Sequence, residues 1–174
     1  MSSSEQIEIP LSKTKLILML AGCVVFVSAG IWFILKPHSG KMFLAGLASI
    51  LFFGLIAFYI VKKLTDKSPG LTISNEGVFD NASAVSAGFI PWADVLEISE
   101  TRVVNQSFIN IIVKNPQEYI DRQTNAFKRK VAQINYNSYG TVIGISANGL
   151  KCNYPELKAA LQERFSLHKN KVNT

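Results

Sequence analysis

The sequence predicts a pair of membrane-spanning helices followed by one small α+β domain. Two uncharged stretches of 20 residues, 16–35 and 42–61, lie near the N-terminus with 6 residues between them. As helices rising about 1.5 Å per residue, each spans about 30 Å, the thickness of the hydrocarbon core of a bilayer. Behind them, short segments of alternating apolar residues are typical of strands, and an amphipathic helical pattern follows.

Two other interpretations of the apolar stretches fit poorly. A secretory signal peptide has an apolar region of about 7–15 residues and a small-residue cleavage site, whereas the first stretch continues through Trp32 to Leu35. A pair of buried core helices would each show a polar stripe, and both stretches are apolar all round.

The lysines that flank the two stretches predict their orientation. Lys13, Lys15, Lys62, Lys63 and Lys67 lie on the side of the termini, and two lysines lie in the connecting loop. Because positive residues accumulate on the cytoplasmic side, we expect both termini in the cytoplasm.

The net charge of +6 invites a nucleic-acid interpretation, but the charge is concentrated beside the membrane. Residues 1–63 hold six lysines and two glutamates, for a net +4, while residues 64–174 carry only +2. A nucleic-acid-binding domain would need a basic face of its own, so we expect no nucleic-acid partner.

The expected organisation has five parts. A polar segment covers residues 1–12, although residues 7–11 could lie on the membrane or on the domain. The hairpin covers residues 13–63, a linker residues 64–70, the α+β domain residues 71–167 and a polar tail residues 168–174.

Strands and turns open the domain. Residues 71–74 and 78–80 alternate about a turn at 75–77, which predicts a β-hairpin. A strand at 88–92 contains Pro91, which suits a sheet edge. Further strands are expected at about 95–104, 108–114 and 141–146, with a short return strand at 150–153.

Two helices complete the domain. Asn115 as N-cap and Pro116 at the first helical position predict a helix, continuing in part to about residue 133. A second helix begins near residues 153–156. We expect one shared core made by Phe79, Trp92, Ile111, Ile143, Leu157, Leu161 and Phe165. Within the spans, the small-residue pairs Ala21 with Ser28, Gly22 with Ala29, and Ala45 with Ser49 predict close helix packing, either within the hairpin or with another membrane protein or a second copy of the chain.

Two further segments carry a family resemblance. The stretch GLTISNEG at residues 70–77, followed by IPWADV at 90–95, resembles a signature of bacterial pleckstrin-homology-like (PH-like) domains. The stretches NPQEYI at 115–120 and YGTVIGISAN at 139–148 resemble a family of small two-span bacterial membrane proteins of unknown function. The resemblance implies a membrane hairpin that carries a C-terminal PH-like domain. In that signature we expect Gly77 to adopt a positive φ, Trp92 to anchor the core and Asp94 to cap a turn.

No catalytic constellation is present in the sequence. The motifs GxSxG, HExxH, GxxxxGK[ST] and CxxC are absent, and the two cysteines lie far apart. We therefore expect no catalytic residues, no metal site and no cofactor, and a protein that is not an enzyme.

Basic residues offer a possible contact with anionic lipid heads. The candidates are Lys62, Lys63, Lys67, Lys128, Arg129 and Lys130. The alternative for Lys128, Arg129 and Lys130 is a solvated helix face, where Glu118 and Asp121 partly balance their positive charge.

The leading hypothesis is a non-enzymatic inner-membrane protein that presents a cytoplasmic PH-like domain to a protein partner. The alternative is a membrane-resident immunity protein that neutralises a toxin. Expected partners are the lipid bilayer and a protein, which could be a membrane protein, a toxin or a second copy of the chain. A lipid-responsive or enzymatic domain is the third hypothesis.

Overall fold

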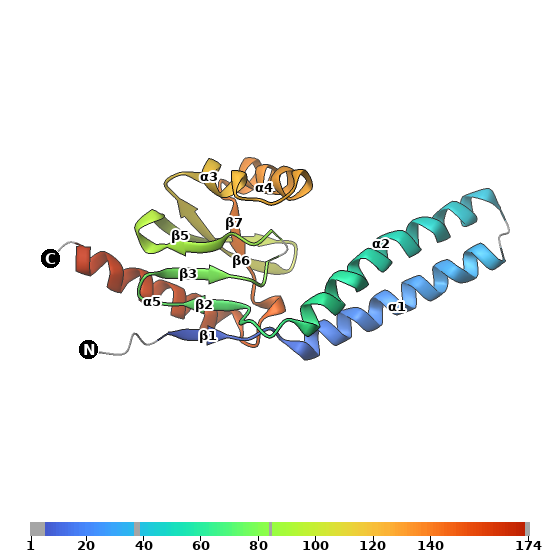
Figure 1. Cartoon of the computed structure of the whole chain (residues 1–174), viewed down its shortest axis with the longest axis horizontal. Helices are drawn as coiled ribbons and strands as arrows, with labels where there is room; N and C mark the ends of the chain where they lie inside the picture. The colour runs from blue at the N-terminus through green and yellow to red at the C-terminus, as the bar shows by residue number, and fades with distance from the viewer. Residues whose placement is uncertain (1–5, 37–38, 84, 173–174) are drawn as a thin grey trace. The chain divides into compact units, whose positions relative to one another are not determined.

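A computed structural model describes residues 6–36, 39–83 and 85–172 (Figure 1). The chain divides into two units: the helical hairpin at Ser12–Lys67, and a domain that combines the residues up to Leu11 with those from Ser68 onward. Three expected segments lie in part outside the described residues. They are the polar N-terminal segment at residues 1–5, the connecting loop at residues 37–38 and the tail at residues 173–174.

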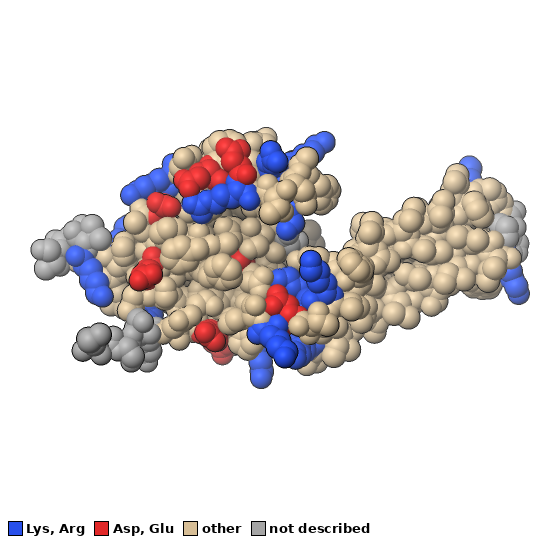
Figure 2. Space-filling model, viewed as in Figure 1, with Lys and Arg blue, Asp and Glu red and all other residues tan. Residues whose placement is uncertain are grey.

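The hairpin consists of α1 (Lys13–Leu35) and α2 (Gly40–Thr65), both long and apolar enough to cross a membrane. The helices begin at serine N-caps, where Ser12 accepts a hydrogen bond from the Lys15 amide and Ser39 from that of Met42. Figure 2 shows Lys and Arg near the ends of the hairpin and none along its middle. The predicted spans, residues 16–35 and 42–61, both lie inside these helices.

The two helices approach each other closely at Gly30 and Gly46. A Cβ added at Gly30 would lie 2.9 Å from the Gly46 carbonyl oxygen, and one at Gly46 would lie 2.7 Å from that of Gly30. Ser49 donates to the Phe26 carbonyl at 2.9 Å, and the rings of Phe26 and Phe53 stack at 4.3 Å. Glycine is therefore required here by the close approach of two backbones.

The expected packing pairs are mostly wrong for contacts within the hairpin. Ala21, Gly22, Ser28 and Ala45 are exposed, and nothing lies within 4 Å of a Cβ built at Gly22. Among these predicted residues, Ser49 makes a hydrogen bond between the two helices, to the Phe26 carbonyl. Spacing identifies residues that share a helix face, but it does not say which face meets the partner helix.

The described residues of the domain form two antiparallel sheets, sheet one and sheet two in chain order. Sheet one has the order β1 (Ile7–Ile9), β2 (Leu71–Ile73), β3 (Gly77–Asp80) and β4 (Gly88–Pro91). A 3₁₀ turn, η1 (Trp92–Asp94), leads to sheet two, which has the order β5 (Val95–Val103), β6 (Gln106–Val113) and β7 (Ile143–Ile145). With the C-terminal helix α5 (Tyr154–Val172), this is the expected PH-like α+β arrangement.

Strand β1 precedes the hairpin in the chain and pairs with the strand that follows it. Ile7 lies opposite Ile73, and Ile9 lies opposite Leu71. The next residues also bind the domain, since the Lys151 amide donates to the Pro10 carbonyl and Leu11 forms a β-bridge with Leu150. Of the expected placements of residues 7–11, the structure shows the one on the domain. The membrane hairpin is thus an insertion between the first two strands of the sheet.

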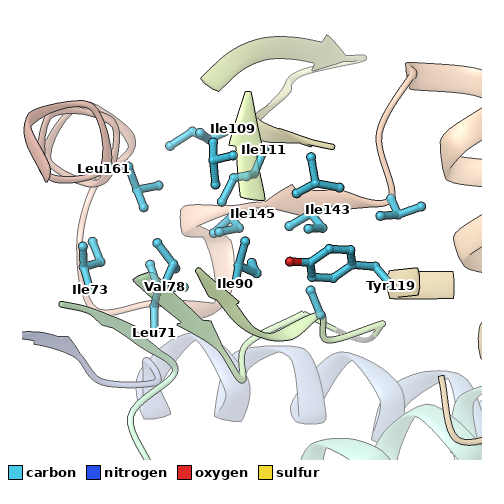
Figure 3. Packing of buried hydrophobic residues seen from close by; sticks show 14 of the residues in the cluster. Leu71, Ile73, Val78, Ile90, Ile109, Ile111, Tyr119, Ile143, Ile145 and Leu161 are labelled. Atoms are coloured by element: carbon cyan, nitrogen blue, oxygen red, sulfur yellow. The ribbon is translucent and has the colours of Figure 1, made fainter. Parts of the chain in front are cut away.

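The core lies between the two sheets and α5 (Figure 3). Trp92, Ile111, Ile143, Leu157 and Leu161 are buried in it, as predicted. Phe165 is partly buried and packs on Trp92 at 5.9 Å between ring centroids.

Phe79 is the error in the predicted core, because its side chain is 44% exposed. Successive residues of a strand point to opposite faces, and Val78 fills the inward position of β3 with no exposed surface.

Gly77 does not adopt the expected positive φ, which only Gly88 and Gly140 show among the described glycines. Its requirement is steric. A Cβ at Gly77 would lie 2.2 Å from the carbonyl oxygen of Ile90, across the β3–β4 pair. Nearby, the indole nitrogen of Trp92 donates to the Ser74 carbonyl at 2.9 Å, which satisfies the polar group of a buried ring.

The helical segments differ from the prediction at their ends. Helix α3 is short (Pro116–Asp121), and α4 (Ala126–Tyr139) runs past residue 133 to the left-handed Gly140. Asn115 precedes α3 but its side chain makes no capping hydrogen bond. A 3₁₀ turn, η2 (Ala147–Gly149), follows β7, and the expected return strand at 150–153 is reduced to the single bridge of Leu150. Helix α5 continues to Val172, past the expected start of a loose tail.

We predict that Gly77→Ala destabilises the domain by about 1–3 kcal/mol, because the added methyl group overlaps the Ile90 carbonyl. The matched control is Gly149→Ala, where a Cβ meets nothing within 4 Å; its effect should stay within about 1 kcal/mol. Urea unfolding of the full chain in mild detergent measures both. Equal unfolding midpoints for the two variants would contradict the steric argument.

We also predict that Leu161→Ala lowers the free energy of unfolding by about 2–5 kcal/mol, because this side chain has no exposed surface. Leu167→Ala on the same helix, at a side chain that is 46% exposed, is the control and should change it little. The same unfolding assay applies, and a Leu161→Ala variant as stable as the control would show that α5 does not close the core.

Candidate functional site

The basic residues singled out in the sequence fall in separate parts of the chain. Lys62 and Lys63 occupy the last turn of α2, where Lys63 lies 3.6 Å from the Asp66 carboxylate, and Lys67 is exposed after the helix. Lys128, Arg129 and Lys130 lie near the start of α4 in the domain. Consecutive residues point about 100° apart around a helix, so the last three do not form one patch.

Lys128 lines a shallow groove of about 450 Å³ together with Arg122, Ser86, Phe89 and Thr124, among others. Arg122 is held in place, because its guanidinium pairs with Glu118 and donates to the Phe89 carbonyl at 3.3 Å. Asn125 caps α4 by accepting from the Lys128 amide at 2.8 Å. The groove is basic, with Arg122 exposed to solvent and Lys128 partly buried.

Asp94 has a different role from the turn cap expected for it. Its carboxylate accepts a hydrogen bond from the Tyr119 hydroxyl at 3.0 Å, and its carbonyl accepts one from the Lys114 amide. Burial, with a smaller contribution from this hydrogen bond, raises the pKa of Tyr119 to about 12. This hydrogen bond therefore fixes α3 against η1.

Asp80 is a buried carboxylate that the sequence analysis did not single out. It closes the turn after β3 by accepting hydrogen bonds from the amides of Ala82 and Ser83 at 3.0 and 3.2 Å. Burial raises its pKa above the usual range, although these hydrogen bonds oppose the shift. No signal in the sequence distinguishes it from a solvated turn aspartate.

The outward face of sheet one carries an aromatic pair. The strand register places Glu8, Thr72, Phe79 and Phe89 in one row across β1, β2, β3 and β4. Phe79 and Phe89 lie directly opposite each other and are 44% and 43% exposed. Large apolar side chains that share an exposed strip are unusual on a surface without a partner.

This row borders an open depression of about 650 Å³, which we call the Phe79–Phe89 face. Its other lining residues are Gln6, Glu8, Pro69, Thr72, Ser74, Asn75, Glu76 and Gly77. The lining contains two glutamates and no lysine or arginine. The face therefore combines an apolar centre with an acidic margin.

Sequence reasoning missed this face because it assigned Phe79 to the core. The alternation in β3 marks Val78 and Phe79 as facing opposite sides, but both are apolar, so the pattern alone cannot tell which one points inward. The contribution of residues 6–8 was also missed, because a strand before the hairpin was not predicted.

Within the described ranges, no group of three or more His, Cys, Asp and Glu residues lies close enough to hold a metal ion. Carboxylates that form hydrogen bonds or ion pairs in the structure hold elements of the fold together. Glu100, for example, accepts from the Tyr154 hydroxyl at 2.6 Å and pairs with Lys158, which joins β5 to α5.

We predict that Asp80→Asn stabilises the domain at neutral pH. Since the folded-state pKa of Asp80 lies above its unfolded value, folding favours the protonated acid, and stability falls as pH rises from about 4 through the raised pKa. Asparagine keeps an oxygen for the Ala82 and Ser83 amides without the buried charge.

Urea unfolding of the full chain between about pH 4 and pH 7 measures this effect. The control is Asp121→Asn, at an exposed carboxylate that accepts from Gln117. Parallel pH profiles for the wild type and Asp80→Asn would show that Asp80 is not the titrating group.

Comparison of the chain with models of protein families, with curated proteins and with solved structures finds no match in any of the three.

Proposed function

We propose that this chain is a non-enzymatic, membrane-anchored interaction protein of the bacterial inner membrane. Its PH-like domain binds a protein partner in the cytoplasm through the Phe79–Phe89 face. The observation that carries the proposal is the pairing of two phenylalanines on the outward side of a sheet, each more than two-fifths exposed.

The aromatic pair supplies the binding energy in this proposal. Burial of a fully exposed phenylalanine side chain contributes about 1.5–3 kcal/mol, and covering the exposed 44% and 43% of these two side chains contributes a corresponding fraction of that. Aromatic residues at the centre of an interface dominate its energetics. Strands β3 and β4 hold both rings on a fixed backbone, so little conformational entropy is lost when a partner covers them.

The charge of the face indicates the chemistry of the partner. Glu8 and Glu76 line the depression around the phenylalanines, and no basic residue lines it. A partner that inserts apolar side chains and carries lysine or arginine around them fits this pattern. Such a margin disfavours the anionic surface of a bilayer, so lipid is the poorer ligand for this face.

The cytoplasmic location rests on the lysine bias of the flanks, with five lysines on the side of the termini and two in the loop. The absence of a catalytic role rests on the sequence, which lacks the motifs of nucleophilic, metal-dependent and phosphate-binding enzymes. The resemblance of residues 70–77, 90–95, 115–120 and 139–148 to small two-span bacterial membrane proteins with PH-like domains is in keeping with the proposed membrane location.

We predict that Phe79→Ser and Phe89→Ser each weaken partner capture at least about tenfold, with the fold retained, because both residues point outward. The control is Phe127→Ser, which removes a phenylalanine that is 76% exposed on α4. The measurement is affinity capture of the full chain in mild detergent, scoring proteins held by the wild type and by Phe127→Ser. Capture that is equally strong in all variants would rule out the face.

Replacing residues 16–61 with an unrelated two-span hairpin tests what the membrane part contributes. Capture should survive, because the proposed face consists of residues of the domain alone. Loss of function with a folded, membrane-bound domain would contradict this, and it is the result that a toxin-neutralising role of the hairpin requires.

A further inference from the structure

A third and smaller cavity lies between sheet two and α4. Its volume is about 230 Å³. Its lining residues are Thr101, Val103, Phe108, Asn110, Asn135, Tyr139, Thr141 and Gly144. None of them is charged, and none belongs to the lining of the Phe79–Phe89 face.

Asn110 forms the floor of this cavity. Its neighbours Ile109 and Ile111 point into the core, so Asn110 points to the opposite face of β6, where it is nevertheless only 4% exposed. Its amide nitrogen donates to the Thr101 hydroxyl at 2.6 Å. Among the residues that the structure describes, its carbonyl oxygen has no partner.

Gly144 keeps the floor open beside that oxygen. A Cβ at Gly144 would lie 3.6 Å from the Asn110 side-chain oxygen and 4.0 Å from the Phe108 ring. A longer side chain would fill the space between them. Thr141 is not available to a ligand, because its hydroxyl donates to the Ile111 carbonyl and accepts from the Ile143 amide.

Helix α4 supplies two more polar groups from above. The Asn135 carboxamide and the Tyr139 hydroxyl line the cavity, and neither makes a hydrogen bond to a described residue. Asn135 is partly buried and the Tyr139 side chain is 45% exposed, so both polar groups remain accessible to a molecule in the cavity. Two carboxamides and one phenol that converge on one cavity are therefore an arrangement that a bound molecule would complete.

We propose that this cavity binds a small uncharged cyclic amide of the size of one six-membered ring. The edge of such a ring presents an N–H beside a C=O, which complements the acceptor and donor of a carboxamide. Phe108 and Val103 provide apolar walls for the ring faces. At about 30 Å³ per water molecule, the cavity holds the volume of about seven or eight waters, enough for one substituted ring.

The packing of α4 gives the ligand a way in. Ala132 is the buried residue of this helix, while Phe127 and Ile134 are exposed. A helix that buries so little apolar surface opens at a low free-energy cost. The ligand would in turn hold α4 against sheet two, because it bonds to groups on both.

Equilibrium dialysis of uracil against the full chain in mild detergent tests the proposal. We expect saturable binding at one site. Asn135→Ala and Tyr139→Phe should each weaken it about 3- to 10-fold, which is the effect of one hydrogen bond, and Gly144→Leu should abolish it by filling the cavity. The matched controls on the same helix are Asn137→Ala and Tyr136→Phe, whose residues do not line the cavity, and they should bind as the wild type does.

Two analogues test the chemistry. 1,3-Dimethyluracil keeps the ring but lacks its N–H groups, and orotate adds a carboxylate for which the cavity has no cation. Each should bind at least about tenfold more weakly than uracil. Absence of saturable uracil binding, or binding that the Asn135, Tyr139 and Gly144 variants leave unchanged in a folded protein, would overturn the proposal. Partner capture is assayed through other residues, so either result leaves the Phe79–Phe89 face untouched.

Discussion

The pairing of β1 with β2 is the constraint on which the rest of the structure depends. It joins a strand that precedes the membrane hairpin to one that follows it, with Ile9 opposite Leu71. Leu71 and Ile73 of β2 have no exposed surface. Val78 on β3 and Ile90 on β4, the next two strands of the sheet, are also fully buried in the core. Without β1, an apolar strand would become an open sheet edge. The domain is therefore complete only as two separated pieces of chain.

The two faces of the domain's sheets carry different chemistry because a strand offers alternate residues to its two sides. The inward residues of both sheets are almost all isoleucine, leucine or valine, and they form one core with Trp92. Outward residues are free of that requirement. On sheet one they form an apolar and acidic surface open to solvent, and on sheet two they form an uncharged polar cavity beneath α4. Protein recognition and small-molecule recognition are thus proposed for different outward faces of one scaffold.

The sequence predicts the elements whose signals are local. The two apolar helices, the strands from β2 to β7 and α5 follow from hydrophobic periodicity and from turn residues, and the C-terminal leucines Leu157 and Leu161 are buried as expected. The sequence-based predictions fail where a residue's structure depends on a contact with a residue distant in the sequence. Residues 7–9 are too short to signal a strand until Leu71 and Ile73 pair with them. Gly77 is needed because of Ile90, and Phe79 points outward because Val78 points inward. For the same reason the sequence does not locate either proposed site. Phe79 meets Phe89 through the register of β3 and β4. Asn110 and Tyr139 line one cavity because α4 docks on sheet two.

The position of the hairpin within the sheet has a consequence for biogenesis. Ile9 leaves the ribosome 62 residues before its partner Leu71, which at about 5–20 residues per second is an interval of about 3–12 s. During that time β1 has no strand to pair with, while α1 and α2 are synthesised. Insertion of the antiparallel helices then brings the start of α1 and the end of α2 together and shortens the loop that the β1–β2 pairing must close. The lipid bilayer would in this way act as a folding template for the sheet domain, and a chain that fails to insert would expose two unpaired apolar strands to aggregation.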